Sequence, residues 1–96
     1  MSVYFLPDKA GQYTVTREMV SDLVKPMVRD FERAHDVLVP QRLIIQAVAA
    51  SVDDSRRYEV VGDVLRLAVT RVVHAMYRHI GKEAPPVTLD VRKCVQ

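Results

Sequence analysis

The sequence has one cysteine, three isolated glycines, no tryptophan and no long apolar run. A single cysteine, Cys94, excludes a disulfide within the chain and a zinc site built from several cysteines. The apolar runs are interrupted by Arg, Asp or His well before the ~18 residues that a membrane-spanning helix needs. The scattered glycines form no phosphate-binding loop. We therefore expect a protein without disulfides, working in a reducing compartment and outside the membrane.

The length and composition predict one folded domain that covers residues 1–96. The chain is 49% hydrophobic and 27% charged, close to the average for globular proteins. A chain of this size buries only about 60 to 65% of its unfolded surface, so we expect a homodimer or a bound partner to add stability. Residues 1–6 lack the basic start of a signal peptide, and Pro7 follows at once. The expected location is cytoplasmic, or nuclear if the source is eukaryotic.

Charge is distributed unevenly along the chain. Residues 1–55 carry six Lys or Arg and eight Asp or Glu, a net charge of −2, whereas residues 56–96 carry eight and four, a net charge of +4. Proteins that bind duplex DNA through many phosphates usually carry a denser positive surface than this. The pattern is compatible with nucleic-acid binding without requiring it.

The first 15 residues indicate a hairpin, with an extended arm as the alternative. Aromatic and β-branched residues stand on both sides of a turn at Pro7–Gly11, where glycine accepts a positive φ. From Thr16 onward the apolar residues recur at the spacing of a helix, which predicts an amphipathic helix over about 16–35. Pro40 suits the first turn of a second, short helix, whose residues 43–52 are apolar enough to be buried on most sides.

A long helix is predicted over residues 55–80. Asp53, Asp54 and Ser55 supply an N-cap and negative charge for its start, and Gly81 suits the position after its end. Only a narrow polar stripe remains on this helix, so it should lie centrally and pack neighbours on two sides. Residues 82–96 form a tail, in which 87–96 fit a strand or a short helix equally well. The fold class is mainly α: a small helical domain with a long central helix and a minor terminal β element.

The sequence offers few groups for catalysis or metal binding. His74 and His79 are five residues apart, about 140° around a helix, so they should not share a ligand-binding face. Asp53 and Asp54 resemble a pair of catalytic carboxylates, but the start of a helix accounts for both of them. Neither a nucleophile with a positioned base nor a set of metal ligands stands out. We expect no enzyme, no cofactor and no metal.

Four short motifs recur in a known family: Arg42-Leu43-Ile44, Val52 with Asp53-Asp54-Ser55-Arg56, Arg78-His79-Ile80-Gly81-Lys82, and Asp90-Val91-Arg92 with Val95-Gln96. The resemblance is to the histone fold, as found in archaeal histones and in histone-fold subunits of transcription assemblies, and it covers residues 40–96. It implies a short helix, a long central helix and a short last helix. It also implies a handshake dimer, more firmly than DNA wrapping.

Two functions follow from these observations. The first is a non-enzymatic protein–protein interaction module, a small regulator, inhibitor or assembly subunit that dimerises or docks on a larger protein. Arginine and tyrosine are favoured at interface hot spots, so the predicted partner-binding residues are those of the long helix's mixed face: Arg66, Arg71, His74, Tyr77 and Arg78. A partner for this face should be acidic and should offer a pocket for the tyrosine ring.

The alternative is a DNA-associated protein, histone-fold-like or helix-turn-helix. A helix-turn-helix would run from Ala47 through a turn at Ser51-Val52 to Val60. Arg56 and Arg57 would then lie at the start of its second helix and contact DNA. Phosphates could instead be contacted by the longer basic series Arg56, Arg57, Arg66, Arg71 and Arg78. Acidic Glu59 and Asp63 interrupt this series, and a solvated face explains it better.

Overall fold

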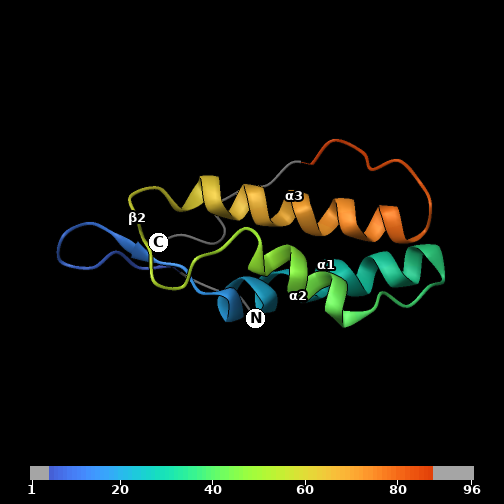
Figure 1. Cartoon of the computed structure of the whole chain (residues 1–96), viewed down its shortest axis with the longest axis horizontal. Coiled ribbons are helices and arrows are strands. Elements are labelled where there is room, and N and C mark those ends of the chain that lie inside the picture. Colours follow the sequence, from blue (N-terminus) through green and yellow to red (C-terminus); the bar gives the residue numbers. More distant parts are fainter. Residues whose placement is uncertain (1–4, 88–96) are drawn as a thin grey trace.

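The structure, a computed structural model, describes residues 5–87 and contains three helices (Figure 1). In chain order the elements are β1 (Tyr13–Thr14), α1 (Arg17–His35), α2 (Gln41–Ala49), β2 (Arg57–Tyr58) and α3 (Val61–His79). The predicted fold class, a small, mainly helical domain with a minor β element, is confirmed. The molecule is elongated, measuring 45 × 22 × 22 Å, with α3 along its length.

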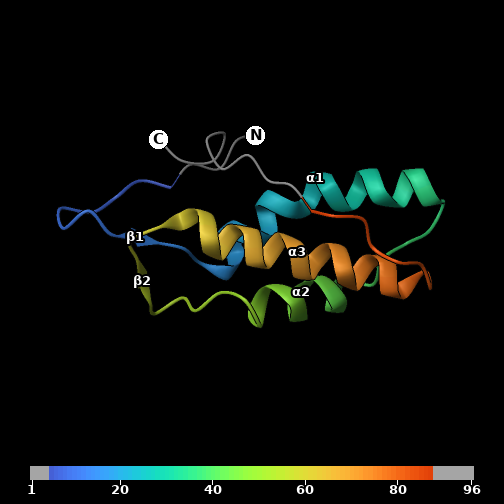
Figure 2. The same cartoon turned by 90° about the horizontal axis from the view of Figure 1, so that it is seen from above.

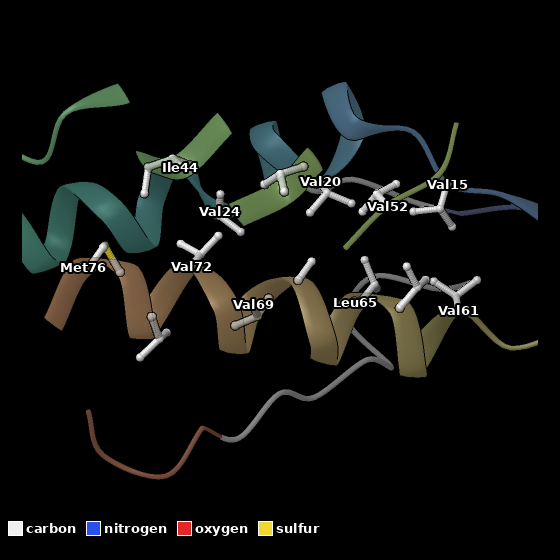
Figure 3. Packing of buried hydrophobic residues seen from close by; sticks show 14 of the residues in the cluster. Val15, Val20, Val24, Ile44, Val52, Val61, Leu65, Val69, Val72 and Met76 are labelled. Atoms are coloured by element: carbon white, nitrogen blue, oxygen red, sulfur yellow. The ribbon is translucent and has the colours of Figure 1, made fainter. Parts of the chain in front are cut away.

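Helices α1 and α2 lie on one side of α3, which packs against both of them (Figures 1 and 2). The core lies in this contact. Figure 3 shows Val20 and Val24 of α1 and Ile44 of α2 turned toward the buried side chains of α3. Nine residues of α3 are buried: Val61, Gly62, Val64, Leu65, Ala68, Val69, Val72, Val73 and Met76. Most of the apolar circumference expected for the long helix is therefore covered within a single chain, and Leu67 is the large apolar residue of α3 that stays exposed.

The first helix agrees with its prediction over 16–35. Thr16 is the N-cap residue, and its side chain accepts a hydrogen bond from the backbone N–H of Met19 at 3.2 Å. This bond satisfies one of the N–H groups that a helix start leaves without a partner. Val20, Val24 and Phe31 form the buried stripe of the helix.

The second helix is shorter and more exposed than predicted. It covers Gln41–Ala49, so it begins next to Pro40 as predicted but ends before residues 50–52, and only Ile44 and Val48 are buried. Ile45 is 54% exposed, so the expectation of burial on most sides was wrong. Beyond the helix the Ser51 hydroxyl donates to the Ala47 carbonyl at 2.8 Å and competes with the backbone for that acceptor.

The third helix begins six residues later than the predicted start at 55. The Asp53 carboxylate accepts hydrogen bonds from the Ser55 hydroxyl (2.7 Å) and the Ser55 N–H (3.0 Å), and these bonds lower the pKa of Asp53. Asp53 thus stabilises a turn in its own loop instead of capping a helix. Arg57–Tyr58 then forms β2, so the chain enters the helix only at Val61.

The small β element joins two distant parts of the sequence. Tyr13 pairs with Tyr58, and Thr14 with Arg57, in antiparallel register. The chain reverses just before β1, where Asp8 N–H donates to the Gln12 carbonyl at 2.7 Å. Hydrogen bonds from the backbone of Gln12 and Ala10, followed by the charge of Arg57, lower the pKa of Asp8. Residues 1–4 of the predicted hairpin lie outside the described residues.

The end of α3 agrees with the prediction. Gly81 has φ +71°, and its N–H donates to the Arg78 carbonyl at 3.1 Å. Lys82 N–H donates to the Tyr77 carbonyl at 3.0 Å, which completes a Schellman cap. The chain then turns back along α3 on the side of α1 (Figure 2), and Ala84 and Val87 pack against the core.

Residues 88–96 lie outside the described residues. This segment contains Cys94 and nearly all of residues 87–96, which were predicted to form either a strand or a short helix. Among the helices that the structure describes, none combines the length and the apolar character needed to cross a membrane.

A cationic groove between α2 and α3

The candidate functional site is a groove of about 500 Å³ between α2 and α3. Among the described residues, none of those in α1 lines this groove. It is lined by Arg42, Leu43, Gln46 and Ala47 of α2 and by Arg71, His74, Ala75, Arg78 and His79 of α3. We call this set the cationic groove.

Helical spacing brings the α3 side chains of the groove together. Arg71, Ala75 and Arg78 follow one another at steps of four and three residues, so they lie along one face of the helix. Arg71 and Arg78 are about 10.5 Å apart along the helix axis, at 1.5 Å per residue. Arg42 lies across the groove, in the first turn of α2.

The groove carries positive charge without an acidic neighbour in its lining. Its three arginines are exposed and remain charged at any physiological pH. Among the described residues that line the groove, none is an aspartate or a glutamate. Guanidinium groups bind carboxylates and phosphates in two-point geometry, so the groove is suited to an anionic ligand.

Two of the side chains are oriented by hydrogen bonds at the ends of α2. A guanidinium nitrogen of Arg71, Nη1, donates to the carbonyl of Ala50 at 2.9 Å, just beyond the C-terminus of α2. At the other end, His79 Nε2 is 3.3 Å from the carbonyl oxygen of Leu38, which can only accept. These contacts connect α3 to the chain just before and just after the short helix.

The groove has an apolar strip between its charged side chains. Leu43 and Ala47 are one helical turn apart on α2, and Ala75 belongs to α3. All three are partly exposed. Because two of them are alanines, the backbone of a bound segment can approach closely here. The site thus combines charged flanks with a shallow apolar centre.

The structure brings together three of the five predicted partner-binding residues. Arg71, His74 and Arg78 line the groove. Arg66 lies outside this lining, and its guanidinium is 3.3 Å from the Asp63 carboxylate. The fifth residue, Tyr77, is directed elsewhere.

Tyr77 packs against α1 instead of facing a partner across the groove. Its ring centroid is 5.0 Å from that of Phe31 and 5.5 Å from that of His35. The first contact is edge-to-face, which is favourable for aromatic rings. Tyr77 therefore contributes to the packing of α1 on α3. A partner of the groove does not need the pocket for the tyrosine ring that was predicted from the sequence.

Sequence reasoning missed three polar residues of the groove, Arg42, Gln46 and His79, and all three residues of its apolar strip. Arg42 and Gln46 belong to α2, and only tertiary packing places that helix beside residues 71–79. His74 and His79 both line the groove, because a groove between two helices accepts side chains from a wide arc of each helix. Among the described residues, no group of three His, Cys, Asp or Glu is placed to hold a metal ion.

The residues of the DNA-binding alternative lie at the other end of the molecule. The helix-turn-helix hypothesis is wrong in its geometry, because residues 53–60 form a loop and β2 instead of the start of a helix. Arg57 forms an ion pair with Asp8, and the Arg56 guanidinium lies 5.0 Å from the centre of the Tyr58 ring. The depression beside them is also lined by Glu59 and Asp63. Its mixed charge is less suited to phosphates than the cationic groove.

The site thus belongs to a small helical domain with an exposed, positively charged interhelical groove. No protein-family model, no curated protein and no solved structure matches this chain.

Proposed function

We propose that the protein is a non-enzymatic interaction module that binds an acidic segment of a larger protein in the cationic groove. It would act as a regulator, inhibitor or assembly subunit, by occluding that segment or by serving as a scaffold for it, and we place it in the cytoplasm. The observation that carries the proposal is the grouping of three exposed arginines around an apolar strip, with no acidic residue among the described residues of the lining.

The apolar strip favours a protein ligand over nucleic acid. A phosphate backbone offers anionic oxygens but no apolar side chains to cover Leu43, Ala47 and Ala75. A protein segment supplies both carboxylates and apolar groups, and interfaces commonly combine a charged rim with an apolar centre. Three arginines also correspond to few phosphate contacts, which would make DNA binding weak at physiological salt.

The described lining also supports binding rather than catalysis. Among residues 5–87, those that line the groove are arginine, histidine, glutamine and apolar residues, with no serine, threonine, cysteine or carboxylate that could act as a nucleophile. The two histidines therefore have no nucleophile to activate among the described lining residues.

A DNA-associated, histone-fold-like protein remains the second candidate. One observation favours it: the short α2 is followed by the longer α3, which is the order that the resemblance of residues 40–96 implies. The last helix of that plan would lie in a part of the sequence outside the described residues.

The proposal can be tested with a fluorescent glutamate-rich peptide as the probe, at roughly 0.15 M salt. We expect the wild-type chain to bind it, and we expect Arg42→Glu with Arg78→Glu to weaken binding by about tenfold or more, because two attractive charges become repulsive. The control is Arg66→Glu, which makes one such charge reversal on α3 outside the groove. Arg71 is left unchanged because its bond to Ala50 also serves the fold.

A thermal midpoint near that of the wild type shows that each variant is folded, since exposed charge changes usually alter stability by less than about 0.5 kcal/mol. Equal loss of binding in the Arg66 control would contradict the groove as the site. A short duplex DNA that binds more tightly than the peptide, with log K falling by about 0.9 per phosphate against log salt, would favour the second candidate. Absence of peptide binding to the wild type would overturn the proposal.

A further inference from the structure

We infer that the segment recognised by the cationic groove is an amphipathic α-helix rather than an extended chain. This inference rests on the proposed function and names the shape of the ligand. It is carried by the backbone environment of the groove, by the spacing of its charges and by its position in the fold.

Every residue that lines the groove belongs to α2 or α3. The backbone N–H and C=O groups inside a helix are bonded within that helix, so the groove offers no strand edge to a bound chain. Its side chains are mostly donors, because arginine has five N–H groups and no acceptor. An extended segment would leave its own N–H groups facing this donor-rich surface, where acceptors are few.

A helical ligand avoids this difficulty because it satisfies its backbone groups internally. Only its side chains then have to match the groove, and their chemistry is complementary to it. Carboxylates on the ligand accept from the guanidinium groups, while an apolar stripe covers the strip formed by Leu43, Ala47 and Ala75.

The spacing of the arginines specifies the pattern of such a helix. Arg71 and Arg78 are two turns apart on α3, so two acidic residues seven positions apart on one flank of a ligand helix would face them. A further acidic residue on the opposite flank would face Arg42. Between the flanks, the alanines of the strip allow the axes of packed helices to approach toward the short end of the usual 8–10 Å range.

The position of the groove leaves room for another helix. Residues 82–87 return along α3 on the side of α1 (Figure 2). None of the described residues of α1 or of the returning segment lines the cationic groove. A bound helix would therefore lie against α2 and α3 as a fourth helix without displacing a described part of the chain.

The experiment compares three synthetic peptides of about 18 residues, long enough for a helix to form on a surface. The first carries the acidic pattern around a leucine and alanine stripe. The second has the same composition with the glutamates moved into the stripe. The third is the first peptide with a proline at its centre. Fluorescence anisotropy gives the affinity, and far-ultraviolet circular dichroism gives the helix content on binding.

We expect the first peptide to bind at least about tenfold more tightly than the proline peptide, because proline interrupts a helix. Its helix content should rise on binding, and Arg42→Glu with Arg78→Glu should remove both effects. Arg66→Glu should leave them unchanged.

The outcomes separate this inference from the proposed function. If the patterned and proline peptides bind equally, and both lose affinity in the double arginine variant, the helix inference is overturned while the acidic-segment function stands. Equal binding of the patterned and rearranged peptides would likewise overturn the predicted pattern. If neither these peptides nor the glutamate-rich probe binds, both proposals fail.

Discussion

Arginine has several distinct roles in this small protein, and each role follows from the surroundings of the side chain. Arg17 and Arg71 donate to carbonyl groups at the C-terminal end of α2. Arg57 pairs with Asp8 and supports the β element. Arg42 and Arg78 instead extend into the cationic groove. Residue type alone therefore does not identify the binding residues; their position relative to α2 does.

The two leucines near the middle of α3 test which face of the helix is buried. Leu65 is fully buried, whereas Leu67 is 44% exposed. We expect Leu65→Ala to lower the free energy of unfolding by about 2 to 5 kcal/mol, because it removes buried methyl groups and leaves a cavity. Leu67→Ala is the matched control and should have a clearly smaller effect. Urea denaturation of both variants measures the difference, and equal losses would contradict the described packing.

At the scale of elements, α2 depends on its neighbours. A nine-residue helix is too short to be stable alone in water. The Arg17 side chain donates from Nε to the Val52 carbonyl at 2.9 Å and from Nη2 to the Ala49 carbonyl at 3.4 Å. Arg71 donates to Ala50 from the side of α3. Two arginines thus bring positive charge and donors to the end of α2, where the helix dipole is negative.

Removal of one of these arginines should loosen α2. We expect Arg17→Ala to lower the free energy of unfolding by about 1 kcal/mol, the usual net contribution of such hydrogen bonds when partly exposed. The exposed Arg33→Ala, at the far end of α1, removes the same side chain and should change stability much less. Hydrogen exchange of the α2 amides locates the effect. Unchanged protection in Arg17→Ala would show that this contact does not hold the helix.

At the scale of the whole molecule, the three helices enclose the core and leave two of their outer grooves accessible. One is the cationic groove. The other lies between α1 and α2, is lined by apolar side chains such as Val28, Val39 and Ile45, and has charged residues at its edges. Most of the apolar surface of α3 is covered within one chain, so this helix needs no second copy, but the small size of the chain remains a reason to expect a dimer. The exposed side chain of Ile45 in this second groove supplies a different one.

We expect the chain to self-associate without any partner. Sedimentation equilibrium should then give a mass near twice the 10.9 kDa of one chain. Ile45→Glu should return the mass to that of one chain, because it places a charge in the apolar contact. Leu38→Glu provides the control, since Leu38 is 83% exposed and lies outside that groove. A wild-type mass of 10.9 kDa would contradict the prediction.

The sequence by itself determined the elements whose signals are local. The apolar period and Thr16 predict α1, and Gly81 predicts the end of α3, because side-chain spacing and a positive φ act within a few residues. The start of α3 was misplaced for the same reason. Acidic residues followed by Ser55 are compatible both with a helix cap and with a turn, and the pairing of residues 57–58 with residues 13–14 selected the turn.

The binding site was decided only by the tertiary structure. The helical period placed Arg71, His74 and Arg78 close together, since they share one element. The helical period could not identify Arg42, because this residue belongs to α2 and its position beside α3 depends on how the two helices pack. The same packing turned Tyr77 toward Phe31 of α1 and out of the predicted site. Periodicity specifies which residues share a face of a helix, whereas the neighbouring elements determine whether that face is buried, bonded or open to a ligand.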